Sequence, residues 1–201
     1  MKKNNLSRIF PIIIIVLVTL IAIFAIVSLG NAIFKPKAPV AGQVDVSREA
    51  LLNTNANRSV RMTIRGPIVA DEDFRSYRVS VSPSSRSMYV YKGYLNEILE
   101  GLDLPNNIAA YEEYVYALDK ANFAYGQPLI GNADDVRGVC ATGTVTEFDI
   151  MNGESAEKHL WTSTCSGSKG SLSAYAPQIK NLFLEQIPNN ERLIRLYGRY
   201  Y

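Results

Sequence analysis

The sequence predicts an α+β protein in which a single N-terminal transmembrane helix is followed by one extracytoplasmic domain. In this domain we expect an antiparallel sheet of about five strands and two to three packed helices. Three observations support the prediction. An uncharged apolar run lies between Arg8 and Lys35. Apolar and polar residues alternate in several short segments after residue 58, which is typical of strands. Apolar residues recur at helical spacing in segments that begin after Pro105 and after Ser173.

Composition limits the size and class of the protein. The chain has 201 residues, enough for one domain with an appendage. The net charge is +2, but residues 1–40 hold five of the 21 Lys and Arg residues and no acid. Residues 41–201 therefore carry 16 basic against 19 acidic residues, about −3, so no excess of positive charge marks a nucleic-acid protein. One His and two Cys exclude a zinc site of these ligands within one chain, and we predict no metal or cofactor.

Residues 9–34 are predicted to form a transmembrane signal-anchor helix. This uncharged run of 26 residues is long enough to cross a bilayer core, for which about 20 residues suffice. A buried core helix is the first alternative, but the rest of the chain is too small to surround so apolar a helix. A cleavable signal peptide is the second, but its apolar region would span only about 7–15 residues.

The flanks of this segment predict the topology. More basic residues precede the apolar run than follow it, which favours a short cytoplasmic N-terminus at residues 1–8. Residues 35–44 contain two prolines and are expected to form a semi-rigid linker. The extracytoplasmic domain then covers residues 45–201, beginning with a brief helix at 45–53. The first expected partner is thus the lipid bilayer, through residues 9–34.

The first strands follow directly. Val60, Met62 and Ile64 alternate with polar residues, which predicts a half-buried strand. A second strand is expected at 77–81 and a third at 87–91, joined by a Pro-Ser-Ser turn. With a four-residue loop, Val79 would oppose Met88 on one face, and Arg78 would oppose Tyr89 on the other.

The middle and the end of the domain are predicted to be helical. A short helix is expected at 94–102, and a longer one capped by Asn106 or Asn107 that ends before Gly126. Another helix begins between Ser173 and Pro177 and ends near Gln186. The pattern of residues 191–197 is ambiguous.

The segment between the two cysteines reads as a hairpin. Asn152-Gly153 is a favoured two-residue turn, and it sets the register of the flanking strands. This register pairs Glu147 with Lys158, Val145 with Leu160, Thr146 with His159, and Cys140 with Cys165. We therefore predict a disulfide between the two cysteines, which implies an oxidising, extracytoplasmic compartment. Two unrelated buried thiols are the alternative.

Arginine and tyrosine are interleaved in the first three strands. We expect them to form a candidate interaction surface, made of Arg61, Arg65, Arg78, Tyr77, Tyr89 and Tyr91. Such a surface suits a protein interface, because Tyr and Arg are enriched at hot spots. It also suits a polyanion, through charge and stacking. An ordinary sheet face with cross-strand Arg–Tyr packing is the third interpretation.

No catalytic residues are predicted. His159 is the only histidine, and no Gly-x-Ser-x-Gly elbow, phosphate-binding loop or dinucleotide motif occurs. The acidic stretches at 71–73 and 134–135 lack the glycine and the distal glutamate of a calcium loop.

These observations favour a membrane-anchored extracytoplasmic domain for binding or envelope assembly, without catalytic activity. Its expected partner is a protein at the cell envelope. The alternatives are a hydrolase of envelope polymers that uses carboxylates, and a receptor for polyanions or nucleic acids that uses the Arg/Tyr face.

Overall fold

A computed structural model describes residues 46–94 and 96–198, which belong to one compact unit, Asp45–Tyr201. No helix within these described residues is long and apolar enough to cross a bilayer. The N-terminal segment at 1–8, the predicted transmembrane helix at 9–34 and the linker at 35–44 all lie outside the described residues.

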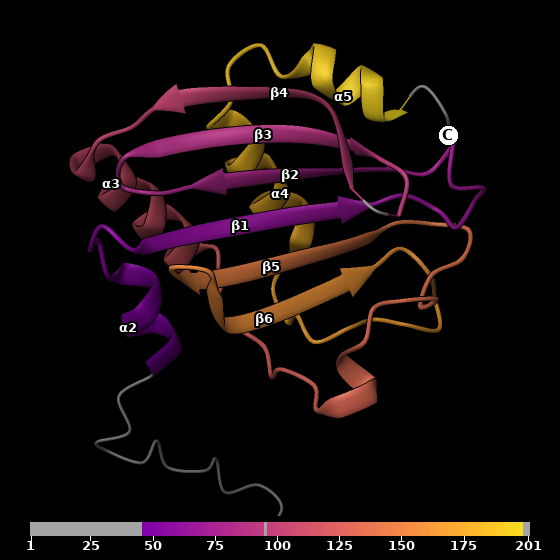
Figure 1. Cartoon of the computed structure of the whole chain (residues 1–201). Coiled ribbons are helices and arrows are strands. Elements are labelled where there is room, and N and C mark those ends of the chain that lie inside the picture. Colours follow the sequence, from indigo (N-terminus) through magenta and orange to yellow (C-terminus); the bar gives the residue numbers. More distant parts are fainter. Residues whose placement is uncertain (1–45, 95, 199–201) are drawn as a thin grey trace, which may run out of the picture. The chain divides into compact units, whose positions relative to one another are not determined.

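The domain is α+β, as predicted, and its sheet has six antiparallel strands instead of about five (Figure 1). The strand order is β4-β3-β2-β1-β5-β6. The strands are β1 (Arg58–Arg65), β2 (Arg75–Val81), β3 (Ser85–Lys92), β4 (Glu97–Pro105), β5 (Val145–Asn152) and β6 (Ser155–Ser163).

The predicted register of β2 and β3 is confirmed. Val79 lies opposite Met88, and Arg78 lies opposite Tyr89. The alternation in β1 is also confirmed, because Val60, Met62 and Ile64 are all buried. Local pattern and a short turn are sufficient here, since both strands of the hairpin bury one face against the same core.

The prediction of a helix at 94–102 is wrong, because residues 97–105 form the edge strand β4. Gly93 and Asn96 both have positive φ and turn the chain back on itself after β3. The segment then pairs with β3 along its whole length, with one register shift between Val90 and Tyr91. Its helical propensity is overridden by this pairing, which satisfies the backbone groups of β3.

Four α-helices are described, more than the two to three expected. They are α2 (Val46–Leu52), α3 (Ile108–Lys120), α4 (Ala176–Glu185) and α5 (Glu191–Gly198); a short 3-10 helix, η1 (Gly131–Asp134), precedes β5. Of the two predicted caps, Asn107 is the one that caps α3, accepting a hydrogen bond from the Ala110 amide at 2.9 Å. The helix α5 resolves the ambiguous segment at 191–197.

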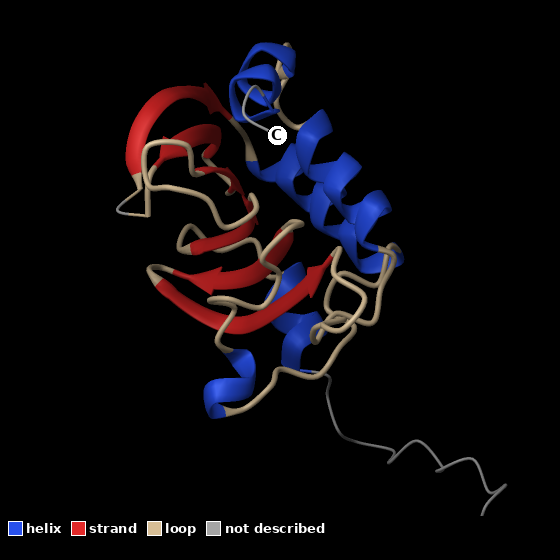
Figure 2. Cartoon of the chain, turned by 90° about the vertical axis from the view of Figure 1, so that its right-hand side faces the viewer, coloured by secondary structure: helices blue, strands red, loops and turns tan. Residues whose placement is uncertain are grey.

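The core lies between one face of the sheet and the four α-helices. Figure 1 looks onto the other face, so that α4 is seen behind the strands, and Figure 2 shows α3 and α4 on one side of the sheet. Phe123, Phe148 and Phe183 meet in this core with ring centroids 5.8 to 6.3 Å apart. We call the opposite side of the sheet the outer face.

The predicted register of the last hairpin is wrong. The turn places Asn152 opposite Ser155, so its central residues are Gly153 and Glu154, and Gly153 has φ +58°. A further shift between Ile150 and Met151 moves the pairing by one more residue. Together these changes move the partners by three positions, and an odd shift exchanges the faces of one strand relative to the other.

The new register replaces each of the predicted pairs in the ladder. Val145 lies opposite Ser163, Thr146 opposite Thr162, Glu147 opposite Trp161, and Asp149 opposite His159. Lys158 turns to the core side, where its ammonium group donates to the Ser47 hydroxyl and to the Ala124 carbonyl.

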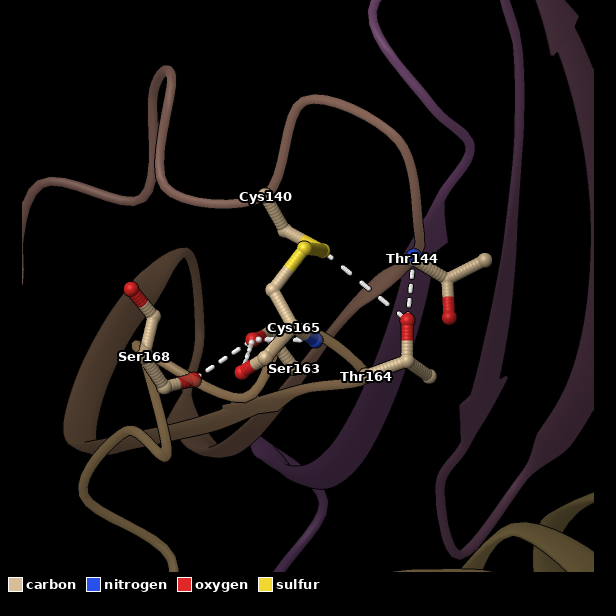
Figure 3. The surroundings of a disulfide bond; sticks show 6 residues. All are labelled: Cys140, Thr144, Ser163, Thr164, Cys165 and Ser168. Atoms are coloured by element: carbon tan, nitrogen blue, oxygen red, sulfur yellow. Dashed lines mark hydrogen bonds between the residues drawn. A yellow bond between two sulfur atoms is a disulfide. The ribbon is translucent and has the colours of Figure 1, made fainter.

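The disulfide between Cys140 and Cys165 is confirmed, with a Cα–Cα distance of 5.5 Å (Figure 3). The cysteines are not partners in the β5–β6 ladder, however, so the register from which their pairing was predicted is wrong. Cys140 lies in the loop before β5, and Cys165 follows β6. The two strand ends are joined by Thr144 and Thr164, whose hydroxyl accepts from the Thr144 amide at 2.9 Å. The bridge therefore ties the loop before β5 to the end of β6.

Candidate functional site

The outer face of the sheet carries five of the six residues of the predicted interaction surface, together with further polar and aromatic side chains. Cross-strand neighbours share a face, so the registers place these residues side by side. They are Arg61, Thr63 and Arg65 on β1, Arg78 on β2, Tyr89 and Tyr91 on β3, Glu147 and Asp149 on β5, and His159 and Trp161 on β6.

Tyr77 is not part of this face, which corrects the predicted interaction surface. Its side chain is only 1% exposed and packs edge-on against Tyr197, with ring centroids 4.9 Å apart. It alternates with Arg78 along β2, so it must point to the helices when Arg78 points to the outer face. Burial accordingly raises the pKa of the Tyr77 hydroxyl well above its usual range.

A network of charges crosses the outer face; we call Arg61, Arg65, Glu147, Asp149 and His159 the charged band. Asp149 accepts from Arg61 Nε at 2.8 Å and lies 2.7 Å from His159 Nδ1. Glu147 accepts from Arg65 Nε at 2.6 Å, and its second oxygen lies 3.9 Å from His159 Nε2. Two carboxylates thus flank the imidazole, and each also forms an ion pair with an arginine.

The band changes the pKa of two of its members. The hydrogen bond to Asp149 raises the pKa of His159, an effect that outweighs the opposing effect of burial. Burial would raise the pKa of Asp149, but its contacts with His159 and Arg61 lower the pKa overall. Both shifts favour the charged forms, so at mildly acidic pH the band holds an ion pair of the half-buried His159 with the buried Asp149.

The other half of the outer face is aromatic. The Arg78 guanidinium lies 5.5 Å from the centroid of the Tyr91 ring, and its Nε donates to Thr63 at 3.3 Å. Tyr89 hydrogen-bonds to Asp103, and this bond raises the pKa of its hydroxyl. Within the described residues, Arg78 makes no ion pair, in contrast to Arg61 and Arg65 in the charged band.

An apolar pocket of about 250 Å³ opens at the end of the outer face where the disulfide lies. We call it the disulfide pocket. Its lining consists of Arg65, Gly66, Ile68, Phe74, Tyr94, Val136, Arg137, Gly138, Cys140 and Val145. Residues from three separate loops therefore meet at the ends of β1 and β5, and one of them, Cys140, is held in place by the bridge to Cys165.

The rim of this pocket exposes apolar surface. Ile68 is 49% exposed and Tyr94 is 46% exposed. The Tyr94 ring stacks on Phe74 at a centroid distance of 4.1 Å, and its hydroxyl donates to the Val69 carbonyl at 2.8 Å. Both contacts hold Tyr94 in place while one side of its ring stays accessible.

The acidic stretches serve local structure. Asp71 accepts from the Tyr94 amide at 2.8 Å, and Asp135 accepts from Arg137, whose contact lowers the pKa of Asp135 to about 2. Among residues 46–94 and 96–198, no group of three or more His, Cys, Asp or Glu side chains is arranged to hold a metal.

Sequence reasoning missed Glu147 and Asp149 as partners of His159, and it missed the disulfide pocket. Glu147 and Asp149 were missed because the predicted hairpin register differs from the observed one by three residues. Such an odd shift assigns the side chains of one strand to the wrong face. The pocket has no local motif at all. The predicted disulfide does lie at this pocket, through Cys140.

Comparison of the sequence with protein-family models and with curated proteins found no match, so the function must be argued from the site itself.

Proposed function

We propose that this protein is a membrane-anchored, extracytoplasmic binding domain without catalytic activity, and that it holds a protein partner at the cell envelope. The observation that carries the proposal is the disulfide pocket with its exposed rim. In our proposal, the pocket receives one bulky apolar side chain of the partner, and Arg65 binds an acidic group next to that side chain.

The size of the pocket supports a side chain as occupant. Sites for small molecules usually enclose about 300–1,000 Å³, whereas this pocket encloses about 250 Å³. Anchor side chains of protein partners commonly fill small, well-packed pockets near the centre of an interface. Ile68 and Tyr94 would add apolar contact area around the anchor.

The charge at the pocket supports an acidic neighbour. Within the described residues, Arg65 donates only its Nε–H, to Glu147. Its terminal N–H groups keep the fork geometry that suits a carboxylate. A carboxylate beside the apolar anchor would therefore bind Arg65 while the anchor fills the pocket.

Membrane anchoring and location rest on two features of the chain. Residues 9–34 are uncharged and apolar over a length that spans a bilayer. The Cys140–Cys165 disulfide is of a kind that persists mainly in oxidising compartments. Both support a domain that faces away from the cytoplasm.

The two alternative functions have less support. A hydrolase needs a carboxylic acid that can donate a proton, but Glu147 and Asp149 each pair with an arginine, and contacts lower the pKa of Asp149. A receptor for polyanions needs a row of unpaired cations, yet Arg61 and Arg65 each pair with a carboxylate on the same face. Among the arginines of the predicted surface, only Arg78 makes no ion pair with a described residue.

A peptide-binding measurement tests the proposal. Fluorescently labelled Gly-Asp-Phe-Gly and Gly-Lys-Phe-Gly are titrated with the full-length protein in detergent, and anisotropy is recorded. We expect the acidic peptide to bind roughly tenfold more tightly, because a charge-assisted hydrogen bond contributes about 1.5–3 kcal/mol.

Val136→Trp, which fills the pocket, and Arg65→Gln should each weaken binding, whereas Ile108→Ser on α3 is the matched control and should not. Equal affinity for both peptides, or affinity that Val136→Trp leaves unchanged, would refute the proposal.

A further inference from the structure

A second pocket, on the helix side of the sheet, is lined by five residues that carry hydroxyl groups and by the apolar parts of their neighbours. It encloses about 490 Å³ between the ends of β5 and β6 and the first turns of α4. We call it the hydroxyl pocket. Its lining consists of Thr144, Thr146, Thr162, Ser163, Thr164, Ala176, Pro177, Lys180 and Asn181.

Two of the hydroxyl groups are already used by the protein. Ser163 donates to the Ser168 carbonyl at 2.5 Å and accepts from the Cys165 amide at 3.2 Å. Thr164 accepts from the Thr144 amide at 2.9 Å (Figure 3). These bonds shape the wall of the pocket next to the disulfide, and they leave little capacity for a ligand.

The remaining polar groups of the pocket have no partner among the described residues. They are the hydroxyls of Thr144, Thr146 and Thr162, the ammonium group of Lys180 and the side-chain amide of Asn181. Thr146 and Thr162 lie directly opposite each other in the β5–β6 ladder, so their side chains are neighbours on one face. Lys180 is half-buried, and no carboxylate lines the pocket.

This combination defines the chemistry of a ligand. Hydroxyl and amide groups both donate and accept, which matches a molecule with several hydroxyls of its own. A half-buried ammonium group without a carboxylate beside it favours an anion. Ala176, Pro177 and the threonine methyl groups offer apolar surface to the C–H face of a ring. The volume also falls within the usual range for small-molecule sites of about 300–1,000 Å³.

We propose that the hydroxyl pocket binds a small polyhydroxylated anion, namely a sugar that carries a carboxylate or a phosphate group. Lys180 binds the anionic group, and Thr146, Thr162 and Asn181 bind the ring hydroxyls. This site lies on the opposite side of the sheet from the disulfide pocket, so it does not depend on the function proposed above.

Calorimetric titration of the full-length protein in detergent tests this proposal. The probes are galacturonate, glucose 6-phosphate, neutral glucose and inorganic phosphate. We expect one or both anionic sugars to bind at least about tenfold more tightly than glucose and phosphate, and the better of the two identifies the anionic group.

Substitutions locate the binding site. Lys180→Met should weaken binding of the anionic sugar roughly 10- to 100-fold, whereas Lys120→Met, which removes the same charge from the end of α3, should not. Thr146→Val should weaken it roughly 2- to 10-fold without lowering the thermal midpoint, because the lost hydroxyl has no partner in the described protein. The bound sugar should also protect Lys180 from acetylation more than Lys120 and Lys169 in the same sample.

Three results would overturn the proposal. One is that neither anionic sugar binds at about 10 mM, a concentration well above typical affinities of specific sites. Another is equal affinity for an anionic sugar and for glucose or inorganic phosphate. The third is equal loss of binding in Lys180→Met and Lys120→Met, which would indicate a general effect of charge.

Discussion

His159 and Asp149 lie directly opposite each other on β6 and β5, and the imidazole Nδ1 is 2.7 Å from the Asp149 carboxylate. Asp149 is nearly buried, with 5% of its side chain exposed, and Arg61 contacts its other oxygen. The protein therefore keeps an ionisable pair within its sheet, where protonation of the histidine affects the stability of the fold.

The first prediction concerns the pH dependence of this stability. The pKa of His159 is raised in the folded state, so its contribution is complete below the unfolded value of 6.5 and is lost as pH rises through the folded pKa. The pKa of Asp149 is lowered, so its contribution is present above 3.8 and is lost as pH falls through the folded pKa. Wild-type protein should thus be more stable at pH 6 than at pH 8.5.

Thermal unfolding of wild type and His159→Gln, followed by fluorescence of Trp161, measures this effect. Trp161 is the only tryptophan and is buried next to Glu147, so it reports on the same region. The loss of stability between pH 6 and pH 8.5 should be smaller in the variant. An identical pH profile for the two proteins would show that His159 does not cause the pH dependence of stability.

The second prediction concerns Gly101 on the edge strand. The Tyr89 ring of β3 lies over Gly101, and a Cβ atom at this position would overlap the ring. Gly101→Ala should displace Tyr89, break its hydrogen bond to Asp103 and destabilise the domain by about 1–3 kcal/mol, the usual cost of overpacking.

Gly167→Ala is the matched control for this substitution. A Cβ atom at Gly167 would meet no neighbour within 4 Å. Chemical denaturation of both variants should show a loss of stability for Gly101→Ala alone. If Gly101→Ala is as stable as wild type, the position of the Tyr89 ring does not require a glycine at residue 101.

The third prediction concerns the disulfide. The bridge closes a sequence separation of 25 residues, so its loss should cost about 3–4 kcal/mol in the loop-entropy model. Reduction should mainly release residues 136–140, and binding at the disulfide pocket should weaken with it. Hydrogen exchange of oxidised and reduced protein checks this, with β1–β3 as an internal reference. Uniform loss of protection across the whole sheet would contradict a local role.

The fourth prediction concerns topology. If residues 9–34 cross the membrane with the N-terminus inside, protease added to intact cells or spheroplasts should digest residues 41–201 and spare an N-terminal tag. Permeabilised cells are the control, in which both parts should be digested. Full protection of the C-terminal domain in unpermeabilised cells would rule out this orientation.

Parts of the fold could be predicted from short segments alone. The alternation of Val60, Met62 and Ile64 indicated a strand, and the turn between β2 and β3 set the pairing of Val79 with Met88. Asn107 marked the start of α3. In each case one segment, or two joined by a short turn, holds enough information, because caps, turns and periodicity act over a few residues.

Other features depended on contacts between distant segments. Residues 97–105 form β4 by pairing with β3, although the pattern of residues 94–102 predicted a helix. The shift between Ile150 and Met151 moved the last hairpin by one residue beyond its turn. The turn had already moved the pairing by two residues, so the two changes together place His159 opposite Asp149 instead of Thr146.

The disulfide illustrates the difference between the two kinds of information. Its existence was predicted from the sequence, whereas the reason given for it was wrong, because the cysteines lie outside the ladder that was used to pair them. Alternation and turn residues determine which segments form strands. Which side chains meet is decided by the register, and a single extra residue in one strand changes it, because side chains on a strand repeat every two residues.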